Sequence, residues 1–167
     1  MITSADTGFV EKKRMNLLTK YGVFSEEELH ARYEVEIEKY CKEILIEARV
    51  LKDMARTIVL PAALEHQRLL LENFRLLKES GVVSKNLFNE TKIFSNSIEK
   101  LISAEKTLDK ILIKCEKQGN LEKCAEICST DLCDNMMELR NVCDFIENQA
   151  SDRVWSLPKY SELLFVD

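Results

Sequence analysis

The feature that most constrains this chain is a helix start at Ser25 that leads into a long apolar stripe. Ser25 precedes three glutamates, so its hydroxyl can accept a hydrogen bond from the Glu28 amide while the Glu28 carboxylate reaches back to the Ser25 amide. Carboxylates in a first turn also favour the positive end of the helix dipole. The sequence therefore predicts that a helix begins at Ser25.

Apolar residues after this cap recur at steps of three and four, the spacing of one face of an α-helix. They are Leu29, Tyr33, Ile37, Tyr40, Ile44, Ala48, Leu51, Ala55, Ile58 and Ala62. The opposite side carries Glu36, Lys39, Glu43, Glu47 and Lys52, and we expect it to face solvent unless a partner covers it. Pro61 lacks an amide hydrogen, so a helix over residues 25–80 should be kinked near this residue.

The rest of the chain repeats the helical pattern. A second long helix is expected at 84–118, with a stripe formed by Phe94, Ile98, Leu101, Leu108, Leu112 and Cys115. The connection before it is short, so the two helices should be antiparallel neighbours. Residues 120–150 form one or two helices, since Ser129, Thr130 and Asp131 can cap a break there, and residues 9–20 form a shorter helix.

Composition agrees with an all-α fold, an antiparallel helical bundle that forms a single domain over residues 1–167. The chain is 46% hydrophobic and 32% charged, with only 4 Gly and 2 Pro. A net charge of -5 without clustered Lys and Arg argues against a nucleic-acid partner. No apolar stretch is long enough to cross a membrane and no signal peptide is recognisable, so a cytoplasmic protein is expected.

Two regions are candidate interfaces. The C-terminal tail, residues 153–167, gathers aromatic and apolar side chains around a proline, and such a terminus should dock into a groove on this bundle or on a neighbouring subunit. Its candidate contacts are Trp155, Pro158, Tyr160 and Phe165. The second region is the charged group Arg32, Glu34 and Glu36, which either forms a solvated face or reaches another subunit.

The chain shows no pattern typical of a catalytic centre. His30 and His66 lie too far apart in sequence for a helical metal pair, and neither common phosphate-binding glycine motif is present. The six cysteines form no C-x-x-C pair, and isolated thiols usually pack as small hydrophobes. A lesser alternative is a soft-metal or redox site at Cys124, Cys128 and Cys133. We assign no catalytic residue, cofactor site or metal site.

Three segments together resemble the C-terminal region of type III glutamine synthetases. They are KYGVFSEEELHARYE at 20–34, DMARTIVLPAA at 53–63 and WSLPKYSELLF at 155–165. The resemblance implies a parent enzyme that forms glutamine from glutamate, ammonia and ATP with Mg or Mn, assembled as stacked hexameric rings. It also implies that the catalytic domains lie upstream, because no catalytic residue of the family maps onto this chain.

The resulting hypothesis is a C-terminal helical domain for assembly and support, inactive in isolation. Its expected partners are the upstream catalytic domain and sibling subunits, with homo-oligomer formation. An alternative is a stand-alone helical protein-interaction module derived from that domain. A third reading, a thiol-based metal or redox sensor, rests only on Cys124, Cys128 and Cys133.

Overall fold

The computed structural model describes residues 17–82, 84–158 and 162, and every regular element among them is helical. The elements are α2 (Glu26–Met54), η1 (Ala55–Val59), α3 (Leu60–Glu79), α4 (Lys85–Glu116), α5 (Leu121–Ile127), η2 (Cys128–Leu132) and α6 (Cys133–Gln149). Residues 17–20 are also helical, and the rest of the helix predicted at 9–20 lies outside the described residues. The predicted all-α class is confirmed.

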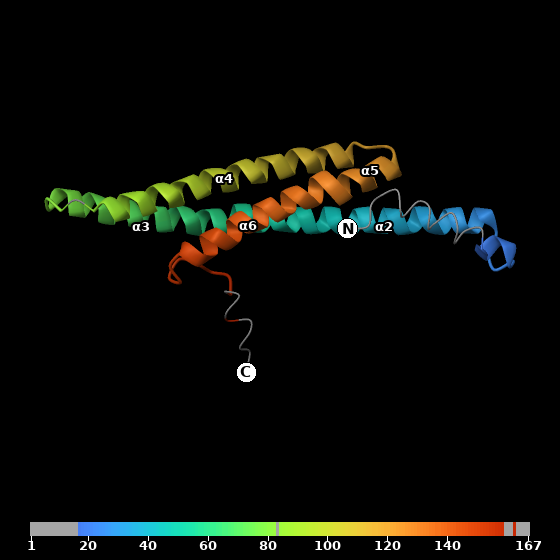
Figure 1. Ribbon diagram of the computed structural model, residues 1–167, viewed down its shortest axis with the longest axis horizontal. Coiled ribbons are helices and arrows are strands. Elements are labelled where there is room, and N and C mark those ends of the chain that lie inside the picture. The colour runs from blue at the N-terminus through green and yellow to red at the C-terminus, as the bar shows by residue number, and fades with distance from the viewer. Residues whose placement is uncertain (1–16, 83, 159–161, 163–167) are drawn as a thin grey trace.

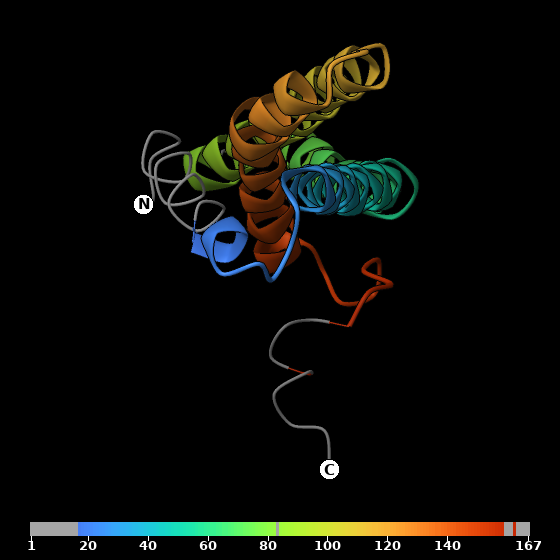
Figure 2. The same cartoon turned by 90° about the vertical axis from the view of Figure 1, so that its right-hand side faces the viewer.

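The helices form an elongated antiparallel bundle. Helices α2 and α3 follow one another in one long rod, α4 returns alongside it, and α6 crosses obliquely over both (Figure 1). The view along the rod shows α6 beside both α2 and α4 (Figure 2). Gly81, at φ 76°, provides the left-handed residue that reverses the chain between α3 and α4. None of the described helices combines the length and hydropathy needed to cross a membrane.

The long rod begins where the sequence predicts. The Ser25 amide donates to Glu28 Oε2 at 2.9 Å, and the Glu28 amide donates to Ser25 Oγ at 3.1 Å. This reciprocal pair forms a capping box, which satisfies two amides that the helix itself leaves without partners. Ser84 caps α4 in a related way, since its hydroxyl accepts from the Leu87 amide at 3.3 Å.

The region before Pro61 contains a π-helical turn, η1. The Leu60 amide donates to the Ala55 carbonyl, five residues back instead of four. Pro61 is the second residue of α3 and directly follows this π turn within the continuous rod. The extra residue in the turn shifts the buried stripe, so Val59 is buried where the sequence predicted Ile58. A kink at Pro61 stays a prediction.

A second π turn, η2, separates α5 from α6. The hydroxyls of Ser129 and Thr130 donate to the Glu126 carbonyl at 3.0 and 2.8 Å, the side-chain competition that predicts a break here. The irregularity is a wider helical turn and not a break followed by a newly capped helix. The chain continues from η2 into α6 through Leu132, which provides no side-chain cap.

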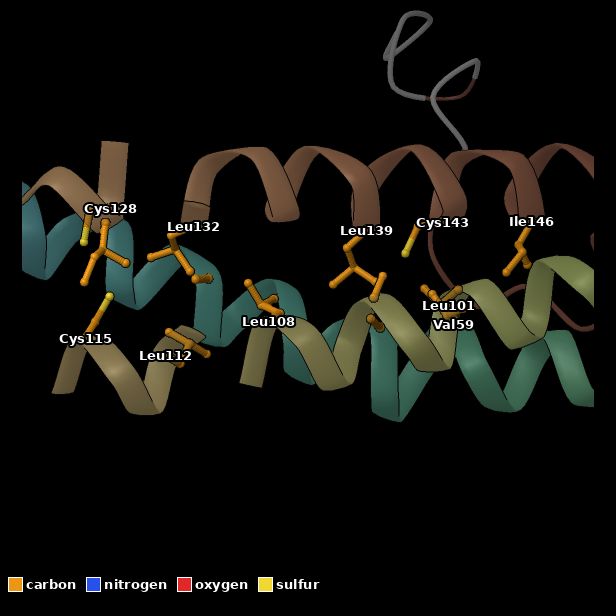
Figure 3. Close-up of a cluster of buried hydrophobic side chains, with 14 of the residues drawn as sticks. Val59, Leu101, Leu108, Leu112, Cys115, Cys128, Leu132, Leu139, Cys143 and Ile146 are labelled. Carbon is orange, nitrogen blue, oxygen red and sulfur yellow. The ribbon is translucent and has the colours of Figure 1, made fainter. Parts of the chain in front are cut away.

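The core lies where α4 and α6 pack on α2 and η1. The predicted stripe of α4 is buried in full: Phe94, Ile98, Leu101, Leu108, Leu112 and Cys115 are each at most 3% exposed. Figure 3 shows Leu108 and Leu112 of α4 facing Leu132 and Leu139 of η2 and α6. On α2 the stripe differs at one position, where Cys41 is buried and Tyr40 is exposed.

One prediction about the charged side of α2 is wrong. Lys52 does not face solvent alone, because its Nζ contacts Asp109 Oδ1 of α4 at 2.6 Å and its side chain is only 27% exposed. Arg49 pairs with Glu116 at 2.6 Å and Arg56 with Glu105 at 3.9 Å. The residue numbers of the acidic partners on α4 fall as those of the cations on the rod rise. This order follows from the antiparallel alignment of α4 with the rod.

Candidate functional site: a groove between α2, α6 and the tail

An open groove of about 530 Å³ lies between the rod, α6 and the first residues of the tail. The rod contributes Ile46, Glu47, Val50, Leu51, Met54, Ala55 and Val59; α6 contributes Arg140, Cys143, Asp144 and Glu147; the tail contributes Trp155, Leu157 and Pro158. A groove with apolar walls and a charged edge has the composition of a protein-binding surface.

The α2 side of the groove carries a strip of exposed apolar side chains. Ile46, Val50 and Met54 follow one another at steps of four residues and are 56%, 52% and 38% exposed. They lie beside the buried stripe of α2, on a separate exposed strip of the same helix. The spacing of four residues was a signal that could have identified them.

The charged edge of the groove is provided by α6. Arg140 Nε donates to Asp144 Oδ1 at 2.8 Å, an exposed pair one helical turn apart. The carboxylate holds the pKa of Arg140 above its usual range, so the guanidinium stays charged. An ion pair at this edge can guide the orientation of a partner, while the exposed apolar strip of α2 supplies contact area.

The tail enters the groove through a short turn after α6. The amides of Val154 and Trp155 both donate to the Ser151 carbonyl, at 3.0 and 3.2 Å. This turn directs Trp155 and Leu157 onto the hydrophobic core, where both are partly buried. The first part of the tail therefore packs on this bundle at Trp155 and Leu157, and docking of the whole tail stays a prediction. Pro158 lies at the exposed margin, and Tyr160 and Phe165 lie outside the described residues.

The other predicted interface lies near the start of α2. The Arg32 guanidinium lies 4.6 Å from the centre of the Phe24 ring, a cation–π contact, and not against Glu36 one turn ahead. His30 Nδ1 lies 3.5 Å from Glu34 Oε1. Arg32 is fourteen residues before Ile46, about 21 Å along a helix. The structure therefore does not join the two predicted interface regions into one surface.

Three cysteines converge where α2 meets α5 and η2, and a fourth, Cys115 of α4, lies beside two of them. The sulfurs of Cys41, Cys124 and Cys128 lie within 4.8 Å of one another, and all three residues are buried. Cys115 of α4 is within thiol hydrogen-bonding reach of Cys124 and Cys128. Burial raises the pKa of Cys41 to about 11 and also raises those of Cys115 and Cys128.

Two of the three cysteines in the sequence alternative, Cys124 and Cys128, lie in this cluster, and the metal or redox role stays a prediction. Cys133 is only partly buried and is not one of the clustered thiols; its pKa is raised by burial and by the nearby carboxylates of Asp134 and Glu47. The other cysteines at the cluster are Cys41 and Cys115. Both lie on helices distant in sequence, so no local spacing could have identified them.

The clustered thiols suit soft cations better than the hard divalent metals that accompany ATP. Among the described residues, the only group of three or more metal-binding side chains is the set of thiols. Mg²⁺ and Mn²⁺ prefer carboxylate, carbonyl and water oxygens. His30 pairs with Glu34, and His66 contacts Phe94 and Ser151. That this chain binds neither ATP nor its divalent metal stays a prediction.

Comparison with known proteins gives consistent matches. Residues 2–78 match the family model described as the glutamine synthetase C-terminal domain. A glutamine synthetase of Bacteroides fragilis is 34% identical over 149 residues, which cover 86% of this chain and 20% of that protein. A type-3 glutamine synthetase of Dictyostelium discoideum is 32% identical over 167 residues, which cover 96% of this chain and 23% of that protein. The chain thus spans about a fifth of the length of these relatives.

Proposed function

Because the chain belongs to the family of glutamine synthetase C-terminal domains, we propose that it assembles and supports the catalytic part of a type III glutamine synthetase. In this proposal the whole enzyme is the ATP-dependent ligase that forms glutamine from glutamate and ammonia. The chain itself carries no part of the chemistry. Its role is mechanical, in that it holds other domains in place.

The observation that carries the proposal is the exposed strip of Ile46, Val50 and Met54 beside the docked tail. A helix at the surface of a bundle gains stability by burying such a strip against a partner, at about 25 cal/mol for each Å² of apolar area. Among the described residues, the tail lines the groove only with Trp155, Leu157 and Pro158. In this proposal the exposed strip of α2 contacts another domain or a sibling subunit.

The proposed partners are the catalytic domain of the enzyme and further copies of the same subunit, in a cytoplasmic oligomer. ATP and Mg²⁺ or Mn²⁺ would bind in the catalytic domain, since the thiols of this chain are unsuitable donors for them. A stand-alone interaction module remains the alternative function. The two differ in whether a catalytic glutamine synthetase domain is the partner.

Binding to a catalytic domain tests the proposal directly. The chain is mixed with a type III glutamine synthetase that lacks its own C-terminal helical region, and association is measured by light scattering after size-exclusion chromatography. We expect association with the chain as it stands and its loss with Ile46→Asp/Val50→Asp. The control is Leu76→Asp, because Leu76 is 60% exposed on α3 and lies outside the groove.

Two results would contradict the proposal. One is glutamine formation by the chain alone when supplied with glutamate, ammonia, ATP and Mg²⁺, which would show that it is itself catalytic. The other is equal association of the groove variant and the Leu76 variant, which would place the interface elsewhere. If the chain binds no catalytic domain at all, the stand-alone module becomes the better reading.

A further inference from the structure

The converging thiols come from parts of the chain that only the fold brings together. Cys41 lies on α2, Cys115 on α4, Cys124 on α5 and Cys128 at the first position of η2. Figure 3 shows the sulfurs of Cys115 and Cys128 pointing toward one another from facing helices. Cys41 is in turn close enough to Cys124 and Cys128 for thiol hydrogen bonds.

The spacing of these sulfurs matches a tetrahedral thiolate site. A Zn–S bond of about 2.3 Å places two ligand sulfurs about 3.8 Å apart in a tetrahedron. The mutual limit of 4.8 Å for Cys41, Cys124 and Cys128 is close to that value, so small side-chain rotations would bring them to it. Cys115 is not one of these three mutually close residues, but it lies beside Cys124 and Cys128, and movement of its side chain would make it the fourth ligand.

The backbone at the cluster is also unusual. Cys124 and Cys128 are four residues apart and therefore share one face of a helix. The π turn η2 begins at Cys128. Such turns widen the helix by one residue at a cost in stability, and they occur often at functional sites.

The surroundings of these thiols oppose deprotonation when no cation is bound. Burial raises the pKa values of Cys41, Cys115 and Cys128, and the neighbouring cysteines raise them further. A bound metal ion would supply the positive charge that the apolar surroundings lack. It would stabilise the thiolate form of its ligands, so these thiols could lose their protons to a metal although they would not do so alone.

We propose that Cys41, Cys115, Cys124 and Cys128 bind one Zn²⁺ ion in a closed structural site that ties α5 to α2 and α4. Binding replaces four S–H bonds by four Zn–S bonds and releases four protons, with no change of oxidation state. Four thiolates and no open position are typical of structural zinc sites. This site is separate from the groove and does not depend on the proposed function.

Metal content tests this site. The chain is purified under reducing conditions, equilibrated with Zn²⁺, desalted and analysed for bound metal. We expect about one zinc ion per chain. Cys41→Ala/Cys128→Ala should retain less than about a tenth of that amount, because two of the four ligands are gone. The matched control is Cys133→Ala/Cys143→Ala, which removes two thiols outside the cluster and should retain the full amount.

Cobalt provides a second measurement that needs no variant. Co²⁺ added to the unaltered chain should give the strong visible bands of tetrahedral cobalt together with near-ultraviolet thiolate-to-cobalt charge transfer. Zn²⁺ should then displace the cobalt and abolish both signals. The melting temperature should rise with Zn²⁺ and fall again with a chelator, since a ligand that binds only the folded state stabilises it.

Several results would overturn the site. They are no stoichiometric zinc in the reduced chain, cobalt spectra without charge transfer, equal metal loss in the control variant, or Cu⁺ binding without Zn²⁺ binding. A disulfide between Cys41 and Cys124 in a chain that takes no zinc would also overturn it. If the cluster variant fails to fold, the cobalt spectra of the unaltered chain decide the matter alone.

Discussion

The imidazole Nδ1 of His66 accepts a hydrogen bond from the backbone amide of Ser151 at 3.4 Å, across a separation of 85 residues. His66 lies on α3, and Ser151 begins the turn that leads the tail into the groove. The His66 ring also meets the Phe94 ring edge to face, with centres 4.8 Å apart. This contact ties the start of the tail to the long rod.

The first prediction concerns pH, because only a neutral imidazole can accept this hydrogen bond. Burial lowers the pKa of His66 below its ordinary value of 6.5. The unfolded chain therefore binds this proton more readily than the folded chain. The stability that His66 contributes is complete above pH 6.5 and is lost as pH falls through the lower pKa of the folded state.

Thermal melts at a series of pH values measure this effect. His66→Gln removes the titrating group, and we expect a smaller loss of melting temperature between neutral and mildly acidic pH. His30→Gln is the matched control, because His30 is exposed and lies on α2. The same pH dependence in the His66 variant and the unaltered chain would show that the contact does not control stability in this range.

The second prediction concerns Trp155, whose Nε1 is buried without a hydrogen-bond partner among the described residues. Trp155→Ala should lower the free energy of unfolding by about 1.5–3 kcal/mol, because the ring packs on the core. Trp155→Phe keeps an aromatic ring and removes the unpaired donor, so its cost should be below about 1 kcal/mol. Urea unfolding followed by circular dichroism measures both, and equal losses would contradict the prediction.

The third prediction concerns Lys52 and Asp109, which join α2 to α4. The hydrogen bond with Asp109 raises the pKa of Lys52, so the pair is charged at neutral pH. A double-mutant cycle with alanine should give a coupling of about 0.5–1 kcal/mol, since the pair is partly shielded from solvent. The Arg75–Glu79 pair is the control, and its more exposed side chains should couple by less than about 0.5 kcal/mol.

The fourth prediction concerns Leu108 of α4, which is fully buried in the core. Leu108→Ala should destabilise the bundle by about 2–5 kcal/mol through the cavity it leaves. Leu76→Ala removes the same atoms at a position 60% exposed and should change stability by less than about 0.5 kcal/mol. Similar losses in the two variants would mean that Leu108 is not a core residue in solution.

Local chemistry accounts for the features that could be predicted from the sequence. The cap at Ser25 and the start of α4 at Ser84 depend on side chains within three residues of the amides they satisfy. The buried face of α4 follows from apolar residues repeated at the period of the helix. These interactions do not require knowledge of any other element.

The sites needed the fold itself. Only Cys124 and Cys128 of the thiol cluster could be identified from the sequence, because Cys41 and Cys115 lie on helices distant along the chain. The sequence also predicted a solvent-exposed Lys52, whereas the folded chain pairs it with Asp109 of α4.

The sequence by itself determined that this chain is helical, where its long helices begin and which face of α4 is buried, because those properties arise from neighbours along the chain. The tertiary structure decided the alignment of the helices, the two π turns and the groove beside Trp155. The physical reason is that side chains on different helices interlock only in the assembled core, and that packing selects which residues meet.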